Sequence, residues 1–252
     1  MDLLILKKIK SKRDFSQIPD KDLELAFNKF SKRQVGEEEK IGLTKELLRK
    51  TFTAFISKKL LSLKDKDPEW ILRKHISTRE RLDYYKLLYE RIFKDYKKVS
   101  IIDLGGGING FSYKFFSKIK VDYLCIESLG QLNELVNFYF QKNKLSGKAI
   151  HESLFEKERI INLIQETKKP RVIFLFKVID ALESFQKDYS KELIFDLIPL
   201  ADRIVLSFAT KSLGKRTNFK AKRKWVIRFI EENFNLLDDF EFGGERYLVF
   251  SK

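Results

Sequence analysis

The sequence is poor in the residues from which disulfides, metal sites and redox centres are built. Among 252 residues there are one cysteine and two histidines. A single cysteine excludes a disulfide framework and a cysteine-based zinc site, and two histidines add few other ligands. We therefore predict no bound metal, and we interpret Cys125 as a buried strand residue within the apolar run 121–126.

Long apolar stretches and targeting features are also missing. No segment reaches the roughly 18 apolar residues that a membrane-spanning helix needs. The first residues, MDLLILKKIK, lack the order of regions that defines a signal peptide. We therefore expect a chain that stays in the cytoplasm.

Acidic residues are in deficit. The chain has 51 Lys and Arg against 36 Asp and Glu, which gives a formal net charge of +15. Such an excess attracts polyanions, and nucleic acid is the leading partner. A lysine-rich composition that serves only solubility gives the same balance, so charge alone does not decide between these interpretations.

Hydrophobic periodicity changes near residue 97. The preceding part shows helical spacing of apolar residues, which predicts helices over 20–34, 44–63, 68–76 and 78–96. After it, short strand-like runs at 99–104, 121–126, 148–151, 171–176 and 204–208 alternate with helical patterns at 111–118, 129–144, 156–167, 189–201 and 220–235. The last residues predict two strands that meet at Gly243 and Gly244. We expect an all-α domain over 1–97 and an α/β domain over 98–252.

The segment 99–110, VSIIDLGGGING, is the strongest sign of a ligand. A buried strand ends in Asp103, and Gly105, Gly107 and Gly110 follow, where missing Cβ atoms let a nucleotide-like ligand approach the backbone. The glycine spacing also fits dinucleotide sites and a purely structural turn. Asp103 favours S-adenosylmethionine, because D-x-G-x-G at a strand end is typical of enzymes that use it. Glu127 ends the next strand and can accept both ribose hydroxyls.

Four blocks occur in the order and spacing of one known family. They are HISTRERL at 75–82, DLGGG at 103–107, FKVIDALE at 176–183 and SFATKSLGKR at 207–216. With them the chain resembles the 16S ribosomal RNA guanine-N7 methyltransferases of aminoglycoside resistance. The resemblance implies a Rossmann-like class I fold that binds S-adenosylmethionine, with seven strands of which the last is antiparallel. It also implies that the all-α domain docks the small ribosomal subunit, and that the target is guanine 1405 (bacterial rRNA numbering).

The resemblance assigns cofactor contacts to charged residues outside the glycine loop. Arg81 would hold the cofactor carboxylate, although a salt bridge to Asp83 or Glu80 is an alternative. Lys177 follows a strand at the sheet edge where ligands bind, and a solvated strand-end lysine is the alternative. His75 is interpreted as a packing or hydrogen-bonding residue. The expected cofactor-binding residues, with two candidates for the adenine edge, are Arg81, Asp103, Gly105, Gly107, Glu127, Ser153, Leu154 and Lys177.

A basic segment follows the last central strand. Residues 211–228 contain eight Lys or Arg and no Asp or Glu, a composition that can neutralise several phosphates. Gly214 is expected to let this segment bend toward the substrate. The RNA-binding residues that we predict are Lys211, Lys215, Arg216, Lys220 and Arg223.

The expected reaction needs little from the side chains beyond positioning. Guanine N7 has a free lone pair at neutral pH, so we predict no general base, with Lys177 the one candidate for a catalytic role. The chain departs from the family pattern at Gly106, Glu127, Asp180 and Ala209. A methyltransferase for another rRNA or tRNA base and a non-catalytic RNA-binding protein stay open. An NAD-dependent oxidoreductase is disfavoured by the terminal hairpin. We expect a monomer.

Overall fold

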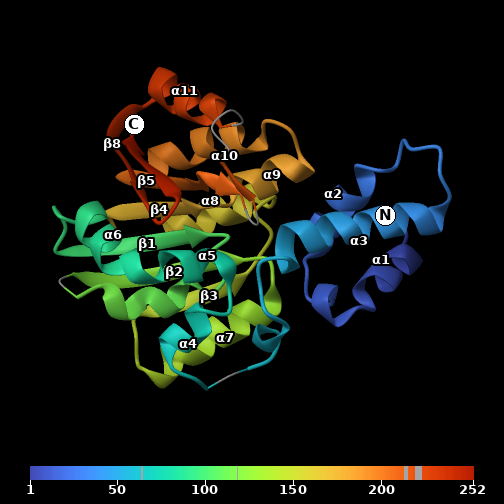
Figure 1. The fold of residues 1–252 in the computed structure, drawn as a ribbon, viewed down its shortest axis with the longest axis horizontal. Coiled ribbons are helices and arrows are strands. Elements are labelled where there is room, and N and C mark those ends of the chain that lie inside the picture. The colour runs from blue at the N-terminus through green and yellow to red at the C-terminus, as the bar shows by residue number, and fades with distance from the viewer. Residues whose placement is uncertain (64, 118, 213–214, 219–222) are drawn as a thin grey trace.

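A single mixed β-sheet forms the centre of the molecule (Figure 1). The computed structural model describes residues 1–63, 65–117, 119–212, 215–218 and 223–252. Within these residues the central sheet has seven strands in the order β3-β2-β1-β4-β5-β9-β8. The strands are β1 (Lys98–Leu104), β2 (Lys120–Glu127), β3 (Gly147–His151), β4 (Arg171–Phe176), β5 (Arg203–Ala209), β8 (Asn235–Phe242) and β9 (Glu245–Ser251).

The first five strands are parallel, and β9 runs antiparallel between β5 and β8. Gly243 and Gly244 join β8 to β9 with positive φ angles of 59° and 81°, a conformation that glycine adopts without a steric penalty. The predicted α/β fold with a reversed last strand is therefore confirmed.

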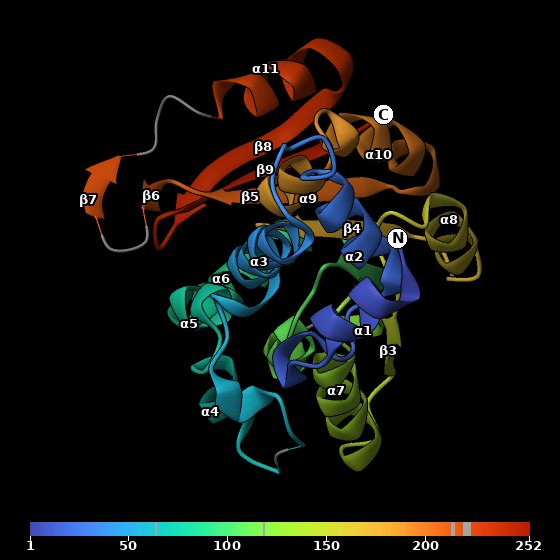
Figure 2. The same ribbon diagram turned by 90° about the vertical axis from the view of Figure 1, so that its right-hand side faces the viewer.

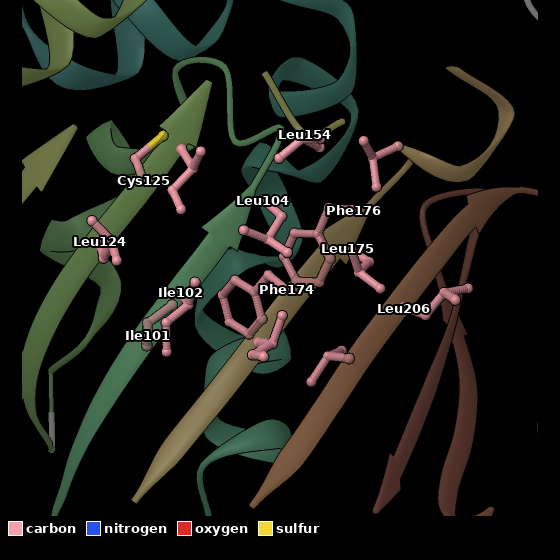
Figure 3. Packing of buried hydrophobic residues seen from close by; sticks show 14 of the residues in the cluster. Ile101, Ile102, Leu104, Leu124, Cys125, Leu154, Phe174, Leu175, Phe176 and Leu206 are labelled. Atoms are coloured by element: carbon pink, nitrogen blue, oxygen red, sulfur yellow. The ribbon is translucent and has the colours of Figure 1, made fainter. Parts of the chain in front are cut away.

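The central strands are apolar without alternation because helices cover both sheet faces. Every residue of β4 is buried, as are the last six residues of β1. Figure 3 shows side chains of β1, β2, β4 and β5 packed on the sheet, among them Phe174 and Leu206. Cys125 is fully buried in β2, as its apolar surroundings predict.

Helices of the α/β part follow the strands in the expected alternation. Between β1 and β2 a 3₁₀ segment, η5, stands where the sequence pattern predicts a helix over 111–118. The elements are η5 (Asn109–Phe115), α7 (Gly130–Lys142), α8 (Lys157–Gln165), α9 (Ile179–Phe185), α10 (Tyr189–Leu197), η6 (Ile198–Leu200) and α11 (Lys224–Asn233). Helix α9 was not predicted.

The region before β1 is helical, with shorter elements than the sequence predicts. Its elements are α1 (Leu3–Lys10), η1 (Arg13–Phe15), α2 (Asp20–Asn28), α3 (Glu37–Leu48), η2 (Arg49–Thr53), η3 (Lys58–Leu60), α4 (Pro68–Leu72), α5 (Ile76–Arg81), η4 (Leu82–Tyr84) and α6 (Tyr85–Ile92). The single helix predicted over 44–63 is wrong. The chain leaves the helix because Ile56 pairs with His75, and the Ile76 amide donates to the Phe55 carbonyl at 2.8 Å.

The helices of this region differ in how they meet the sheet. Helix α6 packs on it through Tyr89, whose ring stacks on that of Phe174 in β4 with centroids 6.2 Å apart. Helices α1 to α3 form a separate group at the right of Figure 1. They reach the α/β part through contacts such as that of Gln131 Nε2, which donates to the Arg13 carbonyl at 3.1 Å. The domain boundary near residue 97 stays a prediction.

A small two-stranded sheet extends from the end of β5. It consists of β6 (Lys211–Ser212) and β7 (Lys215–Asn218), which lie beyond the central sheet in Figure 2. Thus the segment that we predict to contact RNA starts as a hairpin at the carboxyl edge of the sheet. No helix in the described ranges is long and apolar enough to cross a membrane.

Candidate cofactor and RNA site

A cavity of about 760 Å³ opens at the carboxyl ends of the parallel strands. Its walls include the glycine loop after β1 and the residues that end or follow β2, β3, β4 and β5. Helices α2, α3, α5, α7 and α9, the π-helical segment η2 and the turn between β8 and β9 also contribute lining residues. This edge is where open α/β sheets bind ligands.

Neighbouring atoms leave no room for a side chain at Gly105 and Gly106, the first two glycines after β1. Gly105 has φ +68°, and a Cβ there would lie 2.7 Å from Val178 Cγ2. A Cβ on Gly106 would lie 2.8 Å from both the Asp103 carboxylate and Cys125 Sγ. Gly107 has φ +55°. The loop therefore presents backbone to the cavity, as a cradle that a Cβ would fill.

Asp103 organises the base of this loop. Its carboxylate is fully buried, and Oδ2 accepts hydrogen bonds from Asn109 Nδ2 at 2.8 Å and from the Tyr123 hydroxyl. Its Oδ1 has no hydrogen-bond partner among the described residues. Burial raises the pKa of Asp103, while the bonds from Tyr123 and Asn109 oppose that rise. An acceptor is thus available at the predicted position.

Glu127 is fixed by the backbone at the end of β2. Its Oε2 accepts from the Gly107 amide at 2.9 Å, and its Oε1 accepts from the Leu129 amide at 2.8 Å. Burial raises the pKa of Glu127, and these two amides oppose the rise. Each oxygen keeps a lone pair, so the carboxylate can still accept from a vicinal diol.

Arg81 lies on the cavity wall within a buried ionic network. Its Nε donates to Glu245 Oε2 and its Nη1 to Asn109 Oδ1, both at 3.0 Å, while the guanidinium covers the Phe176 ring. Burial alone would lower the pKa of Arg81, but the Glu245 carboxylate outweighs it and holds the pKa well above its ordinary value. The alternative ion pair with Asp83 or Glu80 is not formed, because Arg81 points to β9.

Lys177 completes the network from the end of β4. Its Nζ lies 3.2 Å from Glu245 Oε2 and 2.6 Å from Glu80 Oε2, and its side chain is 14 % exposed. Lys177 also has φ +56°, a strained conformation for a non-glycine residue and one that is frequent at functional sites. The lysine is therefore paired rather than simply solvated.

The two candidates for the adenine edge differ in position. Leu154 lines the cavity, and Figure 3 shows it beyond the carboxyl ends of β1 and β4. Ser153 is fully buried, is not among the lining residues, and accepts from the Phe155 amide at 3.1 Å through its hydroxyl. Within the described residues, Asp22 and Ser128 line the cavity there, and Ser153 does not.

The predicted RNA contacts lie at the mouth of the cavity only in part. Arg223 lines the cavity and donates to the Asp180 carboxylate and to the Ala209 carbonyl. Lys211, Lys215 and Arg216 belong to the β6–β7 hairpin, and their side chains lie outside what the structure describes. Lys220 and Gly214 also lie outside the described residues. These contacts stay predictions.

Sequence analysis missed three polar residues of the site. Asp22 comes from α2, Asn109 bridges Arg81 and Asp103, and Glu245 is the shared partner of Arg81 and Lys177. Only Asn109 had a local signal, since it lies within the glycine motif. The two acids are remote in sequence from every residue that they contact in the site.

His75 lines the cavity as a neutral ring. Burial, followed by the Arg81 and Lys177 cations, lowers the pKa of His75 to about 3. Its Nδ1 is buried without a hydrogen-bond partner among the described residues, and its interpretation as a packing or hydrogen-bonding residue stays a prediction. In the described part of the chain, no three His, Cys, Asp or Glu side chains gather as a metal site.

The strand order, with β9 antiparallel between β5 and β8, is that of the class I methyltransferase fold, and Asp103 and Glu127 lie at the carboxyl ends of β1 and β2. Solved structures of other proteins have the same fold. A structure described as 16S rRNA methyltransferase RmtF in complex with S-adenosyl-L-homocysteine has a TM-score of 0.82 and 21% identity, with 100% of both chains covered. The structure of the 16S rRNA methylase RmtB has a TM-score of 0.75 and 16% identity, with 98% of this chain and 97% of that chain covered.

An rRNA methylase from Escherichia coli gives a TM-score of 0.74 at 16% identity, with 98% of each chain covered. No protein-family model and no curated protein sequence matches the chain. The likeness thus shows the fold, and it includes the helices before β1. The fold that the four sequence blocks imply is confirmed over the whole chain.

Proposed function

We propose that this protein is an S-adenosylmethionine-dependent methyltransferase of small-subunit ribosomal RNA. The observation that carries the proposal is the cavity at the sheet edge, where a glycine cradle, Asp103 and a backbone-held Glu127 converge. Whole-chain likeness to RmtF and RmtB, both described as 16S rRNA methyltransferases, supports the substrate class.

The residues present fit the cofactor from end to end. Arg81 is the cation for the carboxylate end, Asp103 and the glycine loop serve the amino end, and Glu127 accepts the ribose hydroxyls. Leu154 packs beside the adenine. When bound, S-adenosylmethionine supplies an electrophilic methyl group. The chain's own task is to orient that group and exclude water from it.

We assign guanine N7 as the accepting atom. Its lone pair is free at neutral pH, so transfer needs no proton removal, and the neutral His75 fits a cavity that only positions its ligands. Placement of two reactants can supply several kcal/mol of barrier reduction. The target base must leave its stack to enter the cavity. A role in aminoglycoside resistance rests on the sequence blocks named above.

The RNA approaches, in this proposal, past the β6–β7 hairpin. The formal charge of +15 gives the chain a general attraction to phosphates. Arg223 and the turn at Gly243 and Gly244 line the same cavity, so the basic segment flanks its entrance. The helices before β1 are the surface that we assign to docking on the small subunit.

The test is methyl transfer from labelled S-adenosylmethionine to purified small subunits, naked 16S rRNA, large subunits and tRNA. We expect label in small-subunit RNA, and a loss of at least about 100-fold in kcat/KM for Glu127→Ala, because it removes two bonds to a charged acceptor that contribute about 1.5–3 kcal/mol each. Glu166→Ala, at an exposed carboxylate after α8, is the matched control and should retain full activity.

Label in tRNA or large subunits alone would keep the enzyme class and reject the substrate. Absence of label from every RNA, despite measured cofactor binding, would reject the RNA substrate altogether. Equal activity of Glu127→Ala and Glu166→Ala would show that the cavity is not the cofactor site.

A further inference from the structure

One carboxylate on the cavity wall comes from the N-terminal helices. Asp22 lies in α2, is 2 % exposed, and lines the same cavity as Glu127. Its Oδ1 accepts from the Ser128 hydroxyl at a long 3.4 Å, and its Oδ2 has no hydrogen-bond partner among the described residues. A buried acceptor without a donor is destabilising, so this position needs an explanation.

The electrostatic state of Asp22 reflects the missing donor. Burial raises the pKa of Asp22 to about 7, and the Glu127 charge adds to the rise, whereas hydrogen bonds from Ser153 and Ser128 oppose it. No cation is among the causes of the shift. A ligand that brings a neutral N–H donor to Oδ2 would therefore satisfy the carboxylate.

The surroundings of Asp22 indicate what that ligand is. The lining that follows β2 and β3 includes Ser128, which contacts Asp22, and is otherwise mainly apolar: Leu129, Leu132, Leu154 and Phe155, with Phe185 of α9 in ring contact with Phe155. This end of the cavity offers apolar contacts to a flat ring and one acceptor at its edge. Adenine has these properties, because its faces are apolar and its exocyclic amine is a donor.

We propose that Asp22 accepts a hydrogen bond from the exocyclic amino group of the cofactor's adenine, so that α2 completes the cofactor site. The inference rests on the proposed function, because it takes the ligand to be an adenine nucleoside. Asp22 then takes the place at the adenine edge that was predicted for Ser153, and Ser128 contacts its Oδ1. A residue of the N-terminal helices thus selects the base of the cofactor.

The test compares two ligands by isothermal titration calorimetry at about pH 8.5, where Asp22, with its pKa raised to about 7, is ionised. S-adenosyl-L-homocysteine carries the amino group, whereas S-inosyl-L-homocysteine carries an oxo group there, which would face the Asp22 carboxylate. We expect the wild-type protein to prefer the amino ligand at least tenfold. In Asp22→Asn the carboxamide can donate to the oxo group, so the preference should disappear or reverse. Asp20→Asn, at an exposed acid of the same helix paired with Lys10, should keep the wild-type preference.

Three results separate this inference from the proposed function. A wild-type protein that binds both ligands equally well would overturn the inference, whatever the variants do. Wild-type preference retained in Asp22→Asn would also overturn it and leave the proposed function intact. If the wild-type protein binds neither ligand, the proposed cofactor site is itself rejected. Circular dichroism of the ligand-free Asp22→Asn variant verifies that it is folded.

Discussion

The buried network of Arg81, Glu245 and Lys177 makes the structure open to a direct energetic test. Glu245 is 1 % exposed and touches Arg81 at 3.0 Å, Lys177 at 3.2 Å and the Ser207 hydroxyl. Glu245→Gln keeps the shape and leaves the buried Arg81 guanidinium without its carboxylate. Removal of one partner of a buried ion pair costs about 3–5 kcal/mol. We expect at least about 3 kcal/mol of lost stability.

The assays are urea unfolding and thermal unfolding, each followed by the fluorescence of Trp70 and Trp225. At roughly 2–4 °C per kcal/mol for chains of this size, the melting temperature should fall by about 6–12 °C or more. Asp238→Asn is the control, because Asp238 pairs with Arg91 at 2.7 Å while their side chains are 33 % and 43 % exposed. An exposed pair contributes only about 0–1 kcal/mol.

A double-mutant cycle then isolates the buried pair. Arg81→Met combined with Glu245→Gln removes both charges, so the double variant should be more stable than the sum of the two single losses predicts, by at least about 1.5 kcal/mol. Additive losses, or a Glu245→Gln loss no larger than that of Asp238→Asn, would refute the network as described.

Two further predictions concern pH and the glycine loop. Arg81 and Lys177 hold the pKa of Glu245 below its ordinary value of 4.5 despite burial, so the stability that Glu245 contributes is complete above about pH 4.5 and is lost as the pH falls below that. In urea unfolding, the difference in free energy of unfolding between wild type and Glu245→Gln should therefore narrow only in this acidic range. A difference that stays constant down to pH 3 would contradict the pairing. Gly106→Ala should destabilise the protein by about 1–3 kcal/mol, because its Cβ meets Asp103 and Cys125. Cys125→Ala should restore part of that loss in thermal unfolding, and no restoration would contradict the packing.

The glycine loop and its two acidic residues are predictable from patterns of neighbouring residues in the sequence. The strand before Asp103, the glycines after it and Glu127 at the next strand end are contiguous patterns, and the structure brings them to one cavity. The terminal hairpin was predictable for the same reason, since Gly243 and Gly244 lie between two strand-like runs. Such features depend on neighbours in the chain, which a sequence displays directly.

Partners from distant segments were not predictable in this way. Besides a cofactor carboxylate, the sequence offers Arg81 only the nearby Asp83 and Glu80 as partners, yet the carboxylate that it contacts is that of Glu245, 164 residues away. Asp22 meets Ser128 across 106 residues. The predicted helix over 44–63 failed for a related reason, because the Ile56–His75 pairing overrides helical spacing there. Sheet order and helix docking decide these contacts, and neither is encoded in spacing along the chain.

The most direct test of the proposed function is to identify the nucleoside that the protein methylates. Small subunits are treated with the protein and S-adenosylmethionine, their 16S rRNA is digested, and the nucleosides and their positions are mapped by mass spectrometry. We predict 7-methylguanosine at one decoding-site guanine, present only when the cofactor is added. A methyl group on another atom or at another site would contradict the assigned target, and an unmodified 16S rRNA would contradict the proposed function itself.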